Sequence, residues 1–302
     1  MLAPLVESYL VLRRRCGFAL KSEGNMLRSF AAFADAQGDA HVCAQTAIEW
    51  ARLGRSAQQR ARRLGHVIRL TRYARVENPA HELPPPIFGS EKGPRPVPYI
   101  LSPEEVQRLV QAASALGHHA WYDTTYSTFF ALLACTGLRL SEAIRLRFTD
   151  ITPDGLVIRC TKFGKSRLVP LHETARAGLE RYLVQRRLYA PFDDHVFVSL
   201  RRNPLSISSV ECAFHRAART AGLPRAPQRP RPTLHSLRHT FAVRALETCP
   251  DNRDHIMQHM VALSTYLGHG HVAHTYWYLE ATPTLMRDIA ERCERFVIGE
   301  QP

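Results

Sequence analysis

The 302-residue chain carries 40 lysine and arginine residues against 27 aspartate and glutamate residues, which gives a formal net charge of +13. Hydrophobic residues make up 45% of the chain, enough to bury a proper core, and the excess of positive charge favours a polyanionic partner. Apolar runs such as Phe129 to Cys135 are too short to cross a bilayer, and the first residues lack the pattern of a signal peptide, so we expect a cytoplasmic protein.

The seven cysteines are scattered and never form a C-x-x-C pair, which argues against a disulfide framework or a zinc knuckle. We therefore expect the cysteines to serve as small core residues.

Helical apolar spacing predicts helices over residues 2–15, 20–36 and about 46–53, followed by a basic element. Residues 51–75 hold eight arginines and no acidic residue. Ser56 and Gln59 form a plausible capping box, so a helix should begin here and run to about Val76. Its apolar residues gather on one side, and the other side carries a set of polar and aromatic residues suited to the DNA major groove or its phosphate walls: Gln58, Arg62, Arg69 and Tyr73. The alternative is an ordinary solvated helix face.

Residues 78–98 contain seven prolines and two glycines without apolar periodicity, which is typical of an extended linker. The chain is thus predicted to hold a small all-helical domain over residues 1–80, a proline-rich linker over 81–98, and a larger domain over 99–302.

The larger domain should open with a helix over residues 102–116, because Ser102, Pro103 and Glu105 provide a cap, a proline at the first helical position and an acid three residues after the cap. A helix over 123–135 should end at Gly137, and Ser141 is placed to cap the next one. Two strand-like runs, 156–160 and 166–171, flank a turn. The remaining helices are expected at 173–190, 206–221, 235–248, 254–267 and 283–297. The predicted fold class is mainly α, with a mostly helical α+β domain that contains a small antiparallel hairpin or sheet.

Several chemically informative residues stand at characteristic places along this domain. Arg139 lies in the tight turn after Gly137. Lys162 and its rival Lys165 belong to the predicted hairpin. His235 and Arg238 are three apart on one helix, so both side chains should project from one face. His269 follows Leu267 and Gly268, and Tyr278 comes nine residues after it, with Tyr266 and Tyr276 as competing tyrosines.

These motifs resemble the tyrosine recombinase (phage integrase) family over roughly residues 99–285, and the first 90 residues resemble it more loosely. The family's catalytic set, carried over motif by motif, falls on Arg139, Lys162, His235, Arg238, His269 and Tyr278. The family register selects Tyr278 among the tyrosines and favours Lys162 over Lys165. His239 also matches the pattern and is given a supporting role.

The resemblance implies a reaction in which Tyr278 attacks a DNA phosphodiester and forms a 3′-phosphotyrosyl linkage with a free 5′ hydroxyl. Arg139 and Arg238 would hold non-bridging phosphate oxygens, since planar forks suit them. His235 would accept or orient the tyrosine proton, His269 would donate to the phosphate, and Lys162 would protonate the leaving oxygen. No cofactor, ATP or metal is expected, because the energy of the broken bond stays in the ester.

A metal-site interpretation of the histidine-rich segments is weaker. His255 and His259 are four apart, but the glutamate of an H-E-x-x-H motif is absent. His269, His271 and His274 have ligand-like spacing without a nearby acid or cysteine.

The resemblance further implies double-stranded DNA as the partner, a C-shaped clamp of two domains on the duplex, and a nucleoid-associated location. We expect a monomer or dimer when free and a tetramer on paired sites, with sister recombinases of the same mobile element as further partners. The short N-terminus favours a simple core site, and the C-terminal helix is expected to pack on a neighbouring protomer. The alternatives are a type IB topoisomerase or telomere resolvase, and a non-catalytic DNA-binding accessory protein.

Overall fold

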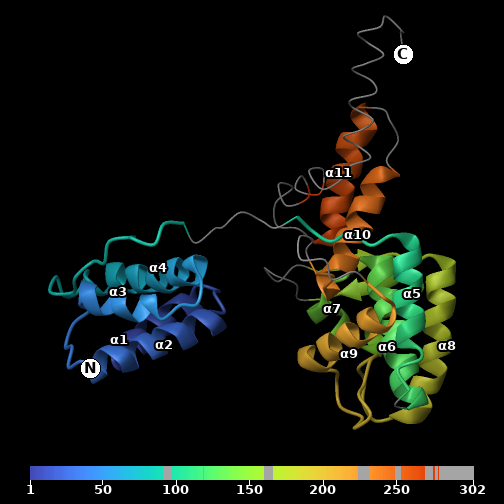
Figure 1. The fold of residues 1–302 in the computed structure, drawn as a ribbon, viewed down its shortest axis with the longest axis horizontal. Coiled ribbons are helices and arrows are strands. Elements are labelled where there is room, and N and C mark those ends of the chain that lie inside the picture. Colours follow the sequence, from blue (N-terminus) through green and yellow to red (C-terminus); the bar gives the residue numbers. More distant parts are fainter. Residues whose placement is uncertain are drawn as a thin grey trace, which may run out of the picture. The chain divides into compact units, whose positions relative to one another are not determined.

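The computed structural model of the protein describes residues 1–90, 97–117, 119–159, 166–223, 231–248 and 253–268, together with Thr275 and Tyr278. The chain divides into two compact units, Met1–Arg95 and Pro96–Pro302 (Figure 1). Over this described part of the chain, no helix combines the length and the apolar character needed to span a bilayer.

The first unit consists of four helices, α1 (Ala3–Arg15), α2 (Lys21–Ala36), α3 (Ala44–Arg52) and α4 (Ala57–Ala74). Their apolar faces share one core, in which Leu10, Phe30, Trp50 and Leu64 are almost completely buried. The rings of Phe30 and Trp50 meet edge to face at 5.4 Å between centroids. Each such large apolar side chain contributes about 1.5–3 kcal/mol when fully buried, so this small core can hold the unit together.

Helix α4 begins where the sequence predicts, because Ser56 Oγ accepts a hydrogen bond from the backbone N–H of Gln59 at 3.1 Å. Gln58, Arg62 and Arg69 are exposed on it. Tyr73, predicted to share this face, is half-buried instead and its ring lies 5.4 Å from that of Tyr9 in the first core. An aromatic ring is stabilised by packing on apolar neighbours, while the hydroxyl of a tyrosine can stay near the surface.

Part of the segment predicted as a linker packs on the first unit. The Nδ1 atom of His81 accepts a hydrogen bond from the backbone N–H of Val42 at 2.9 Å, and the Glu82 carboxylate accepts one from Ala44 at 2.8 Å. Phe88 packs against the first core. Proline-rich chain that pairs its remaining polar groups in this way is held in place even without regular secondary structure.

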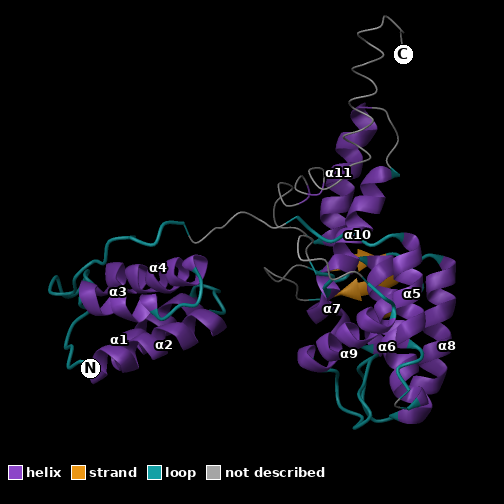
Figure 2. Cartoon of the chain, viewed as in Figure 1, coloured by secondary structure: helices purple, strands orange, loops and turns teal. Residues whose placement is uncertain are grey.

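The second unit is mainly helical and contains a small antiparallel sheet (Figure 2), which confirms the predicted fold class. Its sheet has the order β1-β2-β3 and so contains one strand more than the predicted hairpin. Strand β1 has two residues, too few to show an alternating pattern in the sequence. The elements are α5 (Pro103–Ala113), α6 (Ala120–Thr136), α7 (Leu140–Ile144), η1 (Phe148–Asp150), β1 (Ile151–Thr152), β2 (Gly155–Ile158), β3 (Arg167–Val169), α8 (Glu173–Tyr189), α9 (Ile207–Thr220), α10 (Leu234–Glu247) and α11 (Arg253–Leu267).

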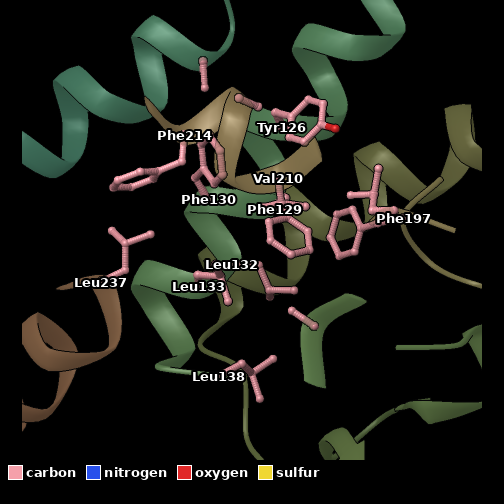
Figure 3. Packing of buried hydrophobic residues seen from close by; sticks show 14 of the residues in the cluster. Tyr126, Phe129, Phe130, Leu132, Leu133, Leu138, Phe197, Val210, Phe214 and Leu237 are labelled. Atoms are coloured by element: carbon pink, nitrogen blue, oxygen red, sulfur yellow. The ribbon is translucent and has the colours of Figure 1, made fainter. Parts of the chain in front are cut away.

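Helix α6 is the central element of the second core, because it packs against α5, α8 and α10. Aromatic residues of α6 meet partners from later segments (Figure 3). Phe129 contacts Phe197 edge to face at 4.9 Å, and Phe130 contacts Phe214 in the same way at 5.7 Å. This packing fixes the C-terminal end of α6, where the turn that carries Arg139 begins.

That turn depends on Gly137, which caps α6 in the left-handed conformation with φ of 60°. A Cβ atom at this position would come within 2.6 Å of the Phe241 ring, so only glycine fits here. Arg139 then stands at the N-cap of α7. The expectation that Ser141 caps this helix is wrong, because Ser141 lies inside α7 and Glu142 instead accepts the backbone N–H of Arg139 at 3.0 Å.

Four cysteines lie in the described residues, and none fills a core. Cys16, Cys135 and Cys212 are exposed, and Cys43 is partly buried. The expectation that cysteines serve as small core residues is therefore wrong for these four. Other apolar side chains of the same helices and loops fill the cores instead.

Candidate active site

Three successive carbonyl oxygens at the C-terminal end of α11 each accept a hydrogen bond from a different arginine. Arg167 Nε donates to the Tyr266 carbonyl at 2.6 Å, Arg238 Nη2 to Leu267 at 2.7 Å, and Arg139 Nη2 to Gly268 at 2.8 Å. The last carbonyls of a helix have no partner within it, and they carry the negative end of the helix dipole. This helix end therefore gathers cations from β3, from α10 and from the turn before α7.

Arg238 is the most buried of the three, with 2% of its surface exposed. Its Nη1 donates to the Gly137 carbonyl at 2.6 Å, so one guanidinium joins the C-terminal ends of α6 and α11. Burial, followed by the positive charge of Arg139, lowers the pKa of Arg238 to about 10. The side chain remains protonated at neutral pH and supplies a fixed positive charge.

Glu142 binds two of these arginines. Its Oε1 accepts from Arg139 Nη1 at 2.7 Å and from Arg167 Nη1 at 3.0 Å, and its Oε2 accepts from Arg167 Nη2 at 2.7 Å. Burial would raise the pKa of Glu142, but the hydrogen bonds and charges of Arg167 and Arg139 outweigh it and lower the pKa to about 2. The carboxylate is therefore ionised at any working pH.

Two histidines of α10 lie beside the arginines. The rings of His235 and His239 meet edge to face at 4.3 Å. Although part of His235 is exposed, desolvation by the protein packed around it, then the charges of Arg238 and Arg139, lower its pKa. Burial, then the neighbouring His235 and Arg238, lowers the pKa of His239 to about 3. Both imidazoles are thus neutral near pH 7.

Tyr278 is buried, with 3% of its surface exposed, among apolar residues of α10 and α11. Its ring lies 5.5 Å from that of His239. The pKa of Arg238 responds to the charges of Arg139 and Tyr278, then to those of Glu142 and Arg167. These five groups therefore share one electrostatic neighbourhood, and the phenol must be uncovered before it can reach a substrate.

The rival Tyr266 is poorly placed for nucleophilic chemistry. Its ring is stacked on Phe241 at 5.3 Å, and burial raises its pKa to about 12. A phenol that is harder to ionise is a weaker candidate for attack at neutral pH.

The structure thus brings together four of the six residues that the sequence singled out, namely Arg139, His235, Arg238 and Tyr278. Lys162, its rival Lys165, His269 and Tyr276 lie outside the described residues, although His269 directly follows Gly268 in the sequence. Sequence reasoning missed Glu142 and Arg167. Glu142 leaves a signal, an acid three residues after Arg139 at a helix start, whereas nothing in its sequence neighbourhood marks Arg167.

A groove of about 640 Å³ leads to Arg139. Arg145, Arg147 and Arg159 line it, together with His195. Arg147 and Arg159 are paired with Asp194 and Asp150, at 2.8 and 2.6 Å. A groove lined by several arginines is suited to an anionic backbone.

Among the described residues, one group could hold a metal ion by spacing, since ligand atoms of Asp193, Asp194 and His195 lie within 4.8 Å of one another. Arg186 and Arg147 already bind these two carboxylates, and the loop is remote in sequence from the arginine cluster. His259 donates from Nε2 to the Ala245 carbonyl at 2.6 Å, which occupies that nitrogen.

Comparison with known proteins places these features in a family context. Residues 100–284 match the model of the phage integrase family. The chain is 36% identical over 304 aligned positions to the Sinorhizobium fredii protein y4rB, named as an integrase/recombinase, and the match covers 96% of each chain.

Two solved structures share the fold. The Tn1549 transposon integrase in complex with transposon right end DNA matches with a TM-score of 0.65 at 19% identity, over 95% of this chain and 98% of that one. A lambda integrase tetramer bound to a Holliday junction matches with a TM-score of 0.65 at 18% identity, over 92% of this chain and 76% of that one.

Proposed function

Because the chain belongs to the phage integrase family of tyrosine recombinases, which are site-specific DNA recombinases, we propose that it cleaves and rejoins double-stranded DNA through a 3′-phosphotyrosyl intermediate on Tyr278. The observation that carries this residue-level proposal is that Arg139 and Arg238 converge on the end of α11, while His239 links the rings of His235 and Tyr278.

In the proposed step, the phenolic oxygen of Tyr278 attacks the phosphorus and forms the new ester as the bond to the 5′ oxygen breaks. The phenol loses its proton, and the 5′ oxygen gains one. Because one phosphate ester replaces another, the energy of the DNA bond is kept, and the reverse attack by a 5′ hydroxyl reseals a strand without ATP.

His235 is the proposed acceptor of the phenolic proton, because its lowered pKa keeps the imidazole neutral and able to accept. We add His239 to the proposed path, a role supported by its contacts with the rings of both His235 and Tyr278. With a pKa of about 3, His239 is a poor proton store and better suited to orienting the two rings.

The two arginines are proposed to stabilise the negative charge that develops on the phosphate. Arg139 has 30% of its side-chain surface exposed and stands at the groove, so it can meet a phosphate directly. Within the described residues, two of its five N–H bonds point to Glu142 and Gly268. Arg238 is too buried to bind without rearrangement, so its charge acts mainly from behind the site.

Lys162 and His269 complete the proposed machinery by family register, as the donor to the 5′ oxygen and a donor to the phosphate. Each residue lies outside the described part of the chain, so their roles rest on the sequence. No metal ion enters this scheme, because cations from the protein neutralise the phosphate.

The first unit is proposed to contact the same DNA through α4. Gln58, Arg62 and Arg69 are exposed on one helix, which suits phosphate and base-edge contacts. A nucleoid-associated location would follow from this binding.

We further propose assembly on two paired sites as a tetramer, by analogy with the lambda integrase tetramer bound to a Holliday junction. The likeness to the Tn1549 integrase supports a role in moving an integrative or transposable element, with sister recombinases of that element as further partners.

The test is to incubate the purified protein with fragments of its source genome that carry nicks, trap covalent complexes, and sequence the attached DNA ends. We expect one recurrent sequence joined to Tyr278 through a 3′ phosphate. In a parallel assay on intact supercoiled plasmid that carries the recovered sequence, relaxation without recombinant products would point to a topoisomerase instead. The absence of any adduct on the nicked fragments would refute the catalytic proposal.

A further inference from the structure

Arg167 holds a central place in the arginine cluster although no step of the proposed reaction uses it. It is the first residue of β3, and its guanidinium grips both oxygens of the Glu142 carboxylate, at 3.0 and 2.7 Å. Its Nε donates to the Tyr266 carbonyl at 2.6 Å. One planar side chain therefore ties the sheet to α7 and to the end of α11.

Stability alone is a poor explanation for this arrangement. The side chains of Arg167 and Glu142 are 9% and 8% exposed, so both ions have lost most of their hydration. Such a buried pair often adds no more stability than an apolar pair of equal volume. What a bidentate ion pair provides beyond an apolar contact is a fixed orientation of the carboxylate.

That orientation matters because the same carboxylate holds Arg139. Glu142 Oε1 receives Nη1 of Arg139, and Oε2 receives its backbone N–H. The Glu142 carboxylate therefore positions both the guanidinium and the backbone of Arg139, and Arg167 holds that carboxylate in place.

A glycine at the end of α11 leaves room for the guanidinium of Arg167. Gly268 adopts φ of 66°, and a Cβ atom there would lie 2.9 Å from Arg167 Nη1. The carbonyl of the same glycine accepts from Arg139. Arg167 and Arg139 therefore share two neighbours. Both bind the Glu142 carboxylate, and both lie against Gly268.

We propose that Arg167 is a positioning residue for DNA cleavage, which acts through Glu142 and the end of α11 to aim the guanidinium of Arg139 at the scissile phosphate. This inference rests on the proposed catalytic function of Arg139. It assigns Arg167 no contact with DNA.

The network also predicts a pH signature. Among the described residues, the charged groups that act on Glu142 are Arg139 before α7, Arg167 on β3 and Arg238 on α10, and the neutral phenol of Tyr266 on α11 lies close to Arg167 and Arg238. Removing Arg167 takes away the partner that opposes the burial of the carboxylate. Glu142 should then take up a proton at a higher pH than in the wild type and release Arg139.

The experiment measures single-turnover formation of the covalent complex on a nicked duplex of the sequence recovered by the trapping experiment, with DNA affinity measured in parallel. For Arg167→Gln we expect a rate roughly 100-fold below wild type, the size of effect that a misplaced catalytic group produces, with affinity within about threefold. Arg167→Lys keeps the charge but not the planar fork and should recover part of the rate.

The pH dependence and a double variant separate positioning from general damage. The rate of Arg167→Gln should fall more steeply than that of wild type as the pH is lowered from about 8 to 5, in the direction expected for a carboxylate whose pKa has risen. Combining it with Glu142→Gln should remove that dependence and slow cleavage no further than the slower single variant.

Arg176→Gln is the matched control, because Arg176 also donates to backbone carbonyls, those of Thr152 at the end of β1 and of Pro153 directly after it. It should cleave at the wild-type rate. Wild-type cleavage by Arg167→Gln, a rate loss matched by an equal loss of DNA affinity, or additive effects with Glu142→Gln would each overturn the inference.

If a circular dichroism melt shows that Arg167→Gln does not fold, the test rests on Arg167→Lys. Cleavage by Arg167→Lys at the wild-type rate would then overturn the inference. Failure of the wild-type protein to form any adduct is a separate result, because it refutes the proposed catalytic function and not the contacts of Arg167.

Discussion

Arg238 donates from Nη1 to the carbonyl oxygen of Gly137 at 2.6 Å, across 101 residues of the chain. The same side chain reaches the Leu267 carbonyl at 2.7 Å. A residue expected to bind phosphate is thus also a structural link between two helix ends, which distinguishes it from the more exposed Arg139.

Replacing each arginine by lysine should separate these roles. Arg238→Lys leaves at least one buried carbonyl without its donor, so we expect the free energy of unfolding to fall by about 1–3 kcal/mol and cleavage to be lost. Arg139→Lys should abolish most cleavage at a smaller cost in stability, because its side chain is partly exposed. Urea unfolding and adduct formation measure the two effects, and equal destabilisation by both variants would contradict this division.

Tyr278→Phe should bind DNA as wild type does and form no adduct, because the variant lacks only the attacking oxygen. Tyr266→Phe is the control, since its phenol has a pKa raised to about 12 and it should still form the adduct. Gel electrophoresis under denaturing conditions reveals the covalent complex. An adduct formed by Tyr278→Phe would show that another residue is the nucleophile.

The lowered histidine pKa values predict how stability depends on pH. The pKa of His239 is about 3 in the folded protein against 6.5 as its ordinary value, and that of His235 is also lowered. Below about pH 6.5 these histidines are protonated in the unfolded chain but stay neutral in the folded chain. The free energy of unfolding should therefore decrease as the pH falls from about 6.5 towards 3.

Denaturant unfolding of His239→Asn over this pH range checks the effect, because an amide does not titrate. The decrease should be smaller in this variant than in wild type. An identical pH dependence in the two proteins would show that His239 does not resist protonation in the folded state.

Gly137→Ala should be destabilising for two reasons, the left-handed backbone and the collision with the Phe241 ring. We expect about 1–2 kcal/mol from the backbone and a further 1–3 kcal/mol from the displaced ring. Gly222→Ala isolates the first contribution, since Gly222 has φ of 65° and nothing lies within 4 Å of its would-be Cβ. Thermal or urea unfolding compares the pair, and equal costs would mean that Phe241 moves away freely.

Arg62→Ala and Arg69→Ala should each weaken DNA binding and reduce the slope of log affinity against log salt by about 0.9, the value for one lost phosphate contact on duplex DNA. Arg28→Ala serves as control, because Arg28 forms an exposed ion pair with Glu7 on other helices of the same unit. Titrations at several salt concentrations supply the slopes. An unchanged slope for both α4 variants would favour the interpretation of this face as merely solvated.

Local signals in the sequence determined the helices that the structure describes, and much of their boundaries. Caps such as Ser56 and Ser102 and the stop at Gly137 act through residues within one turn of themselves, so they can be read from neighbouring positions. The family pattern likewise indicated Arg139, His235, Arg238 and Tyr278 without coordinates.

Only the tertiary structure decided how these residues are held. The bond from Arg139 to Gly268 spans 129 residues and that from Arg167 to Tyr266 spans 99. Arg167 occupies an ordinary strand position in the sequence, and helical geometry alone could not show that the ring of Tyr73 packs near that of Tyr9. The spacing of residues along the chain determines which face of a helix a side chain occupies. The partners, burial and pKa of that side chain depend on elements that are distant in the sequence and come into contact only in the folded protein.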